Sequence, residues 1–218
     1  MTDPLGQSQV IPYLIGLTQK GYSFTLISCE KEENFAKNKT LIQSILTENK
    51  IDWQPISYTK KPPVLSTVYD VNRIKRLAFK LHQQRQFKVV HCRSYIAALI
   101  GLQMKKKFQT KFIFDMRGFW ADERVDGKLW NLKNPVYKTV YNFFKKKEKQ
   151  FLENADYTVS LTQNAKEEMH SWKHIANNPV KIKVIPCCAD LELFDKNKVD
   201  QQKITAIKNE LQIKENAF

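Results

Sequence analysis

The segment VVHCRSYIAALIGLQMKKKFQTKFIFD, residues 89–115, decides the fold class. It contains two short apolar runs, residues 89–92 and 111–115, that are rich in β-branched and aromatic side chains and predict buried strands. Between them, residues 95–106 have an apolar body and a basic end, which is typical of a helix. A strand, a helix and a second strand in this order predict a β–α–β unit with parallel strands.

The same alternation extends to both sides of this unit. Further strands are expected at residues 22–29, 51–58, 157–162 and 180–185. Helices are expected at residues 8–20, 30–50, 71–87, 135–154, 165–175 and 201–211, and a loop at 116–127. The chain is therefore predicted to be α/β, with a Rossmann-like parallel sheet and helices on both faces.

Composition excludes several classes of protein. The 218 residues are 42% hydrophobic, which is enough for a core and excludes wholesale disorder. No apolar run approaches the ~18–20 residues that span a bilayer. The four cysteines form no CxxC pair, which excludes zinc and disulfide scaffolds and favours a reducing cytoplasm. The net charge of +14 predicts an anionic partner or serves solubility alone, and no nucleic-acid motif is present.

Polar side chains gather where the predicted strands end. In parallel sheets ligands bind outside the carboxyl ends of the strands. This rule selects Glu30, His91, Arg93, Asp115, Arg117, Thr162 and residues 186–188. Two arginines and a carboxylate on neighbouring strands predict a polar cleft that holds phosphate or sugar hydroxyls. His91 is either part of this cleft or a satisfied structural histidine.

Other residues extend the candidate site. Trp120 and Asp122 either form the rim of the cleft or anchor the loop. Gly6, before the first helix, either lets the backbone approach an anion or makes a plain turn. The helix at 135–154 places Lys138, Lys145, Lys146 and Lys149 off its apolar side. That pattern fits either an anionic lipid surface or an ordinary helix with a solvated lysine face.

Four segments in order along the chain carry a resemblance to a known family. They are residues 3–9 (DPLGQSQ), 89–91 (VVH), 114–120 (FDMRGFW, with an Asp-x-Arg-x-x-Trp pattern) and 184–194 (VIPCCADLELF). Together they resemble the retaining glycosyltransferases of family 4, which have the GT-B fold. The chain departs from the family where Arg93 replaces a frequent second histidine and where Cys187-Cys188 replaces an Asn-Gly turn.

The resemblance implies an N-terminal, acceptor-side domain of an enzyme that transfers a hexosyl-type sugar from a nucleotide-sugar donor to an acceptor hydroxyl with retention. His91 and Arg93 would be the catalytic candidates. Contacts to substrate would come from Gly6, Gln7, Asp115, Arg117, Trp120 and Asp122. The resemblance implies no metal and no cofactor, a nucleoside-diphosphate sugar as donor, and a glycan or lipid-linked acceptor.

The resemblance also implies a division of the chain. Residues 1–194 would form the Rossmann-like domain, and residues 195–218 a linker to an absent C-terminal donor-binding domain. The domain's first strand would be missing, so that Met1 is not the natural start. The strands at 22–29 and 89–92 should then leave a strand-wide gap or pair directly.

The fragment alone is expected to be inactive, and the protein to be cytoplasmic and peripheral at the inner membrane face. The alternative is a non-catalytic α/β module that binds an anionic glycan, lipid or protein partner.

Overall fold

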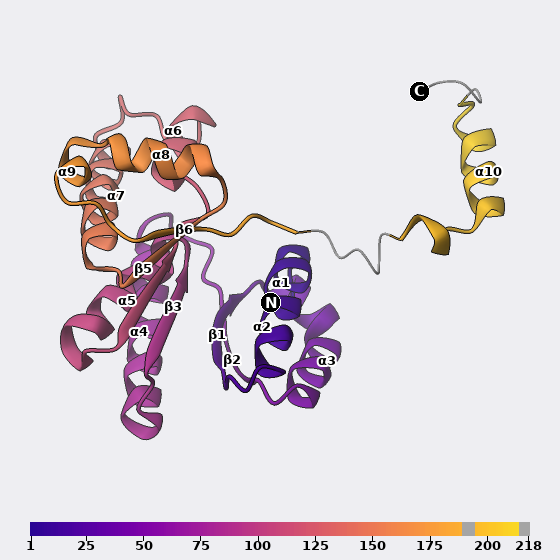
Figure 1. Cartoon of the computed structure of the whole chain (residues 1–218), viewed down its shortest axis with the longest axis horizontal. Coiled ribbons are helices and arrows are strands. Elements are labelled where there is room, and N and C mark those ends of the chain that lie inside the picture. The colour runs from indigo at the N-terminus through magenta and orange to yellow at the C-terminus, as the bar shows by residue number, and fades with distance from the viewer. Residues whose placement is uncertain (189–194, 214–218) are drawn as a thin grey trace. The chain divides into compact units, whose positions relative to one another are not determined.

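The computed structural model describes residues 1–188 and 195–213 of the chain (Figure 1). The chain divides into two compact units, Met1–Pro186 and Cys187–Phe218. In the second unit a 3₁₀ turn (Lys196–Lys198) precedes α10 (Gln201–Glu210). The Asp200 carboxylate caps α10 by accepting a hydrogen bond from the Gln202 backbone N–H. The candidate site residues lie in the first unit, except Cys187 and Cys188, which belong to the second.

Two parallel sheets form the frame of the first unit. In one, β1 (Thr25–Glu30) pairs with β2 (Asp52–Ser57). The other has the order β3 (Val89–Arg93), β4 (Lys111–Asp115), β5 (Tyr157–Ser160) and β6 (Ile182–Val184). Among the residues described, β1 and β3 do not pair with each other. Of the two arrangements expected for these strands, direct pairing is therefore wrong.

Helices cover both faces of these sheets (Figure 1). In the first unit they are α1 (Pro4–Gln9), α2 (Ile11–Thr18), α3 (Glu32–Glu48), α4 (Leu65–Arg85), α5 (Ser94–Phe108), α6 (Trp120–Asp126), α7 (Pro135–Asn154), α8 (Gln163–Ser171) and α9 (Lys173–Ala176). α5 packs on β3 and β4, and α8 packs on β5 and β6. The predicted α/β class with a Rossmann-like parallel sheet is confirmed.

The start of the chain differs from the expected helix at 8–20. Helix α1 begins at Pro4, and α2 begins again at Ile11 after a break at Val10. Pro12 explains the break, because its nitrogen cannot donate to the Ser8 carbonyl that a continuous helix would offer. Gly6 therefore lies inside a short helix and not in an open loop.

Three further boundaries differ from expectation. The predicted loop at 116–127 contains α6, whose first turn carries Asp122 and Glu123, where carboxylates favour a helix N-terminus. The predicted helix at 165–175 is split between α8 and α9 by the extended backbone of Trp172. Helix α4 begins at Leu65, ahead of residue 71, and its buried Asp70 accepts hydrogen bonds from Thr59.

Gly101 allows α5 to lie close to the strands. A Cβ atom at this position would stand 2.5 Å from Cys92 Sγ and 2.6 Å from the Phe112 ring. The main core therefore packs densely between α5, α7 and the four-stranded sheet, around Tyr95, Phe112, Phe114 and Phe151. This packing fixes the ends of β3 and β4, where the candidate site lies.

The region between the two sheets is covered by α4 and α5. Ala78 of α4 and Ile100 of α5 form a small core there, and Ile27 of β1 and Val90 of β3 both pack against it. Despite this cover, Val89 of β3 remains 49% exposed, which is unusual for a strand of a parallel sheet. The two sheets thus share a helical layer although their facing strands are not hydrogen-bonded.

Candidate functional site

Two neighbouring strands bring the predicted polar side chains to one sheet edge. Arg93 ends β3 and Asp115 ends β4, and the register of the sheet pairs these two residues. His91 lies two residues before Arg93, so its side chain is on the same face of the sheet. Arg117 follows Asp115 by two residues. With Gln9 from α1, these residues form the strand-end cluster.

Asp115 is the centre of the cluster. Its side chain is 8% exposed, and its carboxylate lies 3.5 Å from His91 Nε2, 3.9 Å from Arg93 Nη1 and 3.8 Å from Arg117 Nη1. Oδ1 of this carboxylate is buried without a hydrogen-bond partner among the residues described. The separations to the arginines are those of ion pairs and exceed hydrogen-bond length. The carboxylate and the guanidinium groups therefore attract each other as ion pairs, but these ion pairs do not fill the hydrogen-bonding capacity of the carboxylate.

Gln9 links α1 to the strand ends. Its Oε1 accepts a hydrogen bond of 2.7 Å from Arg93 Nη2 and one of 2.9 Å from Arg117 Nη2. One neutral oxygen therefore bridges two guanidinium groups. The sequence predicted a contribution from this segment but placed it at Gly6 and Gln7. Gln9 lies two positions beyond Gln7, on the opposite side of the helix, since each helical residue turns about 100°.

The backbone is strained next to both strand ends. Ser94, which follows β3, has φ +68°, and Arg117 has φ +65°. Such left-handed conformations cost roughly 1–3 kcal/mol for residues other than glycine and concentrate at functional sites. Neither residue is glycine or asparagine, so the fold maintains both against their preference. Lys50, Val64, Gln86, Gln109, Lys128 and Gln212 also have positive φ, so this conformation is not confined to the strand-end cluster.

The charge of the cluster selects its ligand chemistry. Two guanidinium groups and one carboxylate leave a net charge of +1 when His91 is neutral. The side chains of Arg93 and Arg117 are 27% and 21% exposed, so both reach solvent. Guanidinium groups bind phosphate and carboxylate oxygens in a bidentate manner. The arrangement can therefore hold an anionic group beside an imidazole.

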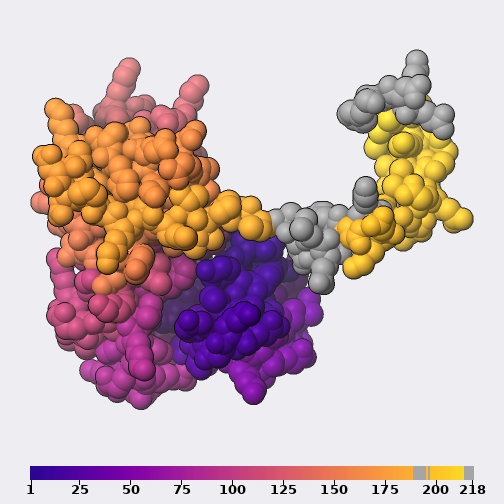
Figure 2. Space-filling model, in the orientation of Figure 1, coloured from indigo at the N-terminus to yellow at the C-terminus, as the bar shows by residue number. Residues whose placement is uncertain are grey.

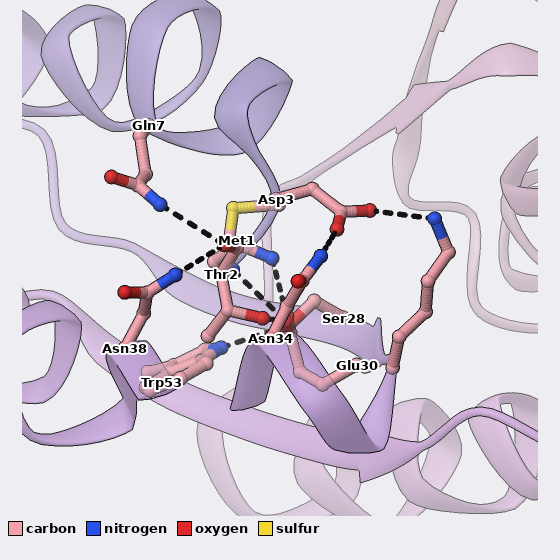
Figure 3. Close-up of polar contacts among 10 residues, drawn as sticks. Met1, Thr2, Asp3, Gln7, Ser28, Glu30, Asn34, Asn38 and Trp53 are labelled. Atoms are coloured by element: carbon pink, nitrogen blue, oxygen red, sulfur yellow. Dashed lines mark hydrogen bonds and ion pairs between the residues drawn. The ribbon is translucent and has the colours of Figure 1, made fainter. Parts of the chain in front are cut away.

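Glu30, at the end of β1, has a structural role (Figure 3). It is 3% exposed and accepts hydrogen bonds from Ser28 Oγ, from the backbone N–H and hydroxyl of Thr2, and from the N-terminal ammonium of Met1. Burial alone would raise the pKa of Glu30, but these hydrogen bonds outweigh it and lower the pKa to about 2. Glu30 thus fastens the first residues to β1.

Gly6 and Gln7 face this same N-terminal network. A Cβ at Gly6 would lie 2.7 Å from the Met1 backbone, so the glycine serves close packing there. Gln7 Nε2 donates a 3.0 Å hydrogen bond to the Thr2 carbonyl (Figure 3). These contacts therefore do not place Gly6 in a pocket with the strand-end residues. The predicted role of Gly6 and Gln7 in substrate binding stays a prediction.

Trp120 and Asp122 lie in the layer formed by α6 and α7. The Trp120 ring packs edge-on against Trp130 at 5.2 Å and against Phe144 at 4.9 Å. The Asp122 carboxylate accepts hydrogen bonds from Tyr141 Oη at 2.8 Å and from Lys145 Nζ at 2.9 Å. These ring contacts anchor Trp120 in the helix layer. Its predicted contact with substrate stays a prediction. Asp122 belongs to a separate polar network, which sequence spacing did not reveal.

Lys145 does not belong to the solvated face of α7. Its ammonium lies between Asp122 and Glu148, and Glu148 is only 2% exposed. Lys146 and Lys149 are exposed as expected. The apolar side of α7 is used for the core, where Phe144, Phe151 and Leu152 are buried. The basic surface of the helix is therefore formed without Lys145.

The remaining strand ends contribute caps or surface. Thr162 caps α8 by accepting a hydrogen bond from the Ala165 N–H, and Cys187 and Cys188 are exposed. Residues 189–194 of the motif at 184–194 lie outside the described residues. Within the described parts, no group of three His, Cys, Asp or Glu side chains is placed to hold a metal ion. In those same parts, no helix combines the length and apolarity needed to cross a membrane.

Comparisons with solved structures find distant similarity. A sucrose-phosphate synthase from Thermosynechococcus elongatus is 14% identical over 78% of this chain and 49% of its own, with a TM-score of 0.48. UGT73P12 of Glycyrrhiza uralensis, solved with glycyrrhetinic acid 3-O-monoglucuronide, is 10% identical over 81% of this chain and 46% of its own, with a TM-score of 0.45. This chain thus spans about half the length of each of these proteins.

A search of curated proteins finds no match. The model of the family described as Glycosyltransferase Family 4 matches residues 10–193. The match includes the strand-end histidine, both arginines of the cluster and the carboxylate between them. Since it extends over most of the sequence, this chain belongs to glycosyltransferase family 4.

Proposed function

We propose that the chain forms the acceptor-side half of a retaining glycosyltransferase that moves a hexosyl group from a nucleoside-diphosphate sugar to an acceptor hydroxyl. The observation that carries this proposal is the strand-end cluster, in which Arg93, Arg117, Asp115 and His91 meet at one sheet edge. Family membership supplies the reaction class. The net positive charge of the cluster suits the anionic groups that such a reaction handles.

Each residue of the cluster has a role that its position supports. Arg93 and Arg117 would offset negative charge on the departing diphosphate or on an anionic acceptor. The Asp115 carboxylate, 3.5 Å from His91 Nε2, would orient the imidazole and leave Nδ1 directed to the acceptor. His91 would then accept or relay the proton of the acceptor hydroxyl. No metal or organic cofactor is part of this proposal.

We further propose that donor binding needs a C-terminal domain beyond this chain. The 218-residue chain by itself should then bind a nucleotide sugar weakly and should not transfer it. Isothermal titration with uridine and guanosine diphosphate sugars tests the first point. A micromolar affinity, about −8 kcal/mol, would show that the donor is held by this half alone and would contradict the proposed division of labour.

Turnover by the full-length gene product tests the proposal itself. Release of nucleoside diphosphate in the presence of a glycan acceptor is the readout. Arg93→Ala and Arg117→Ala should each lower kcat/KM by at least 100-fold, because each removes a cation from the cleft. Arg85→Ala is the matched control, since Arg85 is 42% exposed and pairs with Asp52 away from the cluster. Equal activity of all three variants would refute the assigned site.

A peripheral position at an anionic membrane face is the second part of the proposal. Lys106 of α5 and Lys146 of α7 lie close enough to Lys147 to lower its pKa, after the larger effect of partial burial. A cationic surface thus joins two helices. Because α7 uses Phe144, Phe151 and Leu152 for the core, this surface would attach mainly by charge. Phe143, which is 45% exposed and lies 5.7 Å from Lys147 Nζ, would add an apolar contact.

A further inference from the structure

A pocket lies in the layer of α6, α7, α8 and α9, helices that pack together at one end of the first unit (Figure 1). Its volume is about 660 Å³, within the roughly 300–1,000 Å³ that is usual for small-ligand sites. Its lining includes Asp122, Tyr141, Lys145, Glu148, Trp172 and His174, and no residue of the strand-end cluster. Helices α8 and α9 (orange) are at the molecular surface in Figure 2.

One wall of the pocket is a fixed polar network. Lys145 Nζ donates to Asp122 Oδ2 at 2.9 Å and pairs with Glu148 Oε1 at 2.5 Å. Tyr141 Oη donates to Asp122 Oδ1 at 2.8 Å, and Tyr95 Oη donates to Glu148 Oε2. Each carboxylate oxygen thus receives one hydrogen bond and keeps a second lone pair. The side chain of Asp122 is 34% exposed, so solvent reaches part of it.

Apolar side chains would pack these helices at a lower energetic cost than this charged network does. Glu148 is 2% exposed, and burial raises its pKa, although Lys145 and Tyr95 act in the opposite direction. Replacing buried ion pairs by apolar side chains of similar volume is often neutral or stabilising. The buried carboxylate beside a lysine therefore marks this pocket as a candidate binding site.

Aromatic side chains line the pocket next to this network. The Trp172 ring lies 5.5 Å from the Phe119 ring and 5.8 Å from that of His174, and Lys145 Nζ is 5.1 Å from the Trp172 centroid. His174 Nε2 is buried without a hydrogen-bond partner among the residues described. The pocket thus combines an apolar flat surface with preset acceptors and donors at short range.

The charge of the lining decides between neutral and anionic ligands. Asp122, Glu148 and Glu168 oppose Lys145 and Lys173, which leaves a net charge of −1 when His174 is neutral. Such a lining gives an anion no advantage, in contrast to the +1 of the strand-end cluster. Carboxylates that accept from hydroxyls and a ring that covers C–H groups match an uncharged sugar ring.

We propose that this pocket binds one or two neutral sugar units of a glycan, separately from the strand-end cluster. The choice of a glycan rests on the proposed function, whereas the choice of a neutral polyol rests on the pocket itself. The strand-end cluster would bind anionic groups, and the pocket would bind uncharged sugar units.

Saturation-transfer NMR on the 218-residue chain tests the proposal. The probes are methyl α-D-glucopyranoside, methyl α-D-mannopyranoside and N-acetylglucosamine, with glucose 6-phosphate as the anionic comparison. At least one neutral probe should receive saturation. Asp122→Asn and Trp172→Leu should each weaken the binding of this probe at least 10-fold. Trp172→Phe should keep most of the wild-type binding, because phenylalanine retains an aromatic surface.

Asp156→Asn is the matched control. Asp156 also accepts hydrogen bonds from two lysines, Lys105 and Lys111, but does not line the pocket. Circular dichroism confirms that each variant is folded before binding is compared. Absence of transfer to every neutral probe, or equal weakening by Asp156→Asn, would overturn the pocket assignment. Neither result affects the turnover test of Arg93 and Arg117, so failure of this inference is distinct from failure of the proposed function.

Discussion

Glu30 should make the stability of the first unit depend on pH. Its pKa falls from 4.5 to about 2 through hydrogen bonds that only the folded chain provides. At about 1.36 kcal/mol per pKa unit, this difference is worth about 3 kcal/mol at neutral pH. Because the folded pKa is the lower one, the contribution is complete above about pH 4.5 and is lost as the pH falls toward 2.

Glu30→Gln removes this contribution. At pH 7 the variant should unfold with a free energy about 3 kcal/mol smaller than the wild type, since the Met1 ammonium, Ser28 and Thr2 lose a charged acceptor. Roughly half of that difference should remain at pH 3, and little at pH 2. Urea unfolding followed by circular dichroism at the three pH values measures it.

Glu33→Gln is the control for this experiment. Glu33 lies exposed in the first turn of α3, where loss of a carboxylate costs only about 0.3–1 kcal/mol. A difference for Glu30→Gln that is the same at pH 2 and pH 7 would refute the reasoning. So would a difference at pH 7 no larger than that of Glu33→Gln.

Three further changes test other features. Gly101→Ala should destabilise the fold by about 1–3 kcal/mol in urea unfolding, because its Cβ would meet Cys92 Sγ at 2.5 Å; an unchanged midpoint would contradict the close approach of α5. Arg117→Gly should abolish transfer by the full-length enzyme but change Tm by only a few degrees, since relief of the left-handed backbone offsets the lost contacts; a large fall in Tm would show that the arginine is structural. Replacing Lys146 and Lys149 together by glutamate should abolish binding to acidic vesicles, measured by co-sedimentation, and wild-type binding should weaken toward 1 M salt; equal binding to neutral vesicles would exclude an electrostatic attachment.

The order of the elements was predictable because apolar runs and helical spacing are local features of sequence. Every predicted strand is present, and the register of β3 and β4 places Arg93 beside Asp115 as the strand-end rule expected. The boundaries were less accessible. The break at Val10 follows from Pro12, a visible signal, but α6 formed where charged and aromatic residues had indicated a loop.

The partners of side chains could not be predicted from spacing. Gln9 joins the arginines because α1 ends beside them, which is a matter of tertiary packing. Lys145 has the same helical context as its exposed neighbours, yet it turns inward because Asp122 of α6 and Glu148 lie within reach. A helical pattern shows which side of α7 is apolar but not which lysine at its border finds a carboxylate.

The amide of Gln9 also determines which hydrogen bonds a ligand must replace when it binds to the strand-end cluster. The Gln9 oxygen that bridges the two guanidinium groups carries no charge, whereas an anionic oxygen in its place would add Coulomb attraction to both of them. An incoming phosphate or carboxylate gains from displacing it, whereas a neutral ligand replaces one neutral acceptor with another and gains little. In Gln9→Glu, the new carboxylate would pair with Arg93 and Arg117 and would compete with an anionic ligand for them. Titration of inorganic phosphate against both forms should show tighter binding to the wild type.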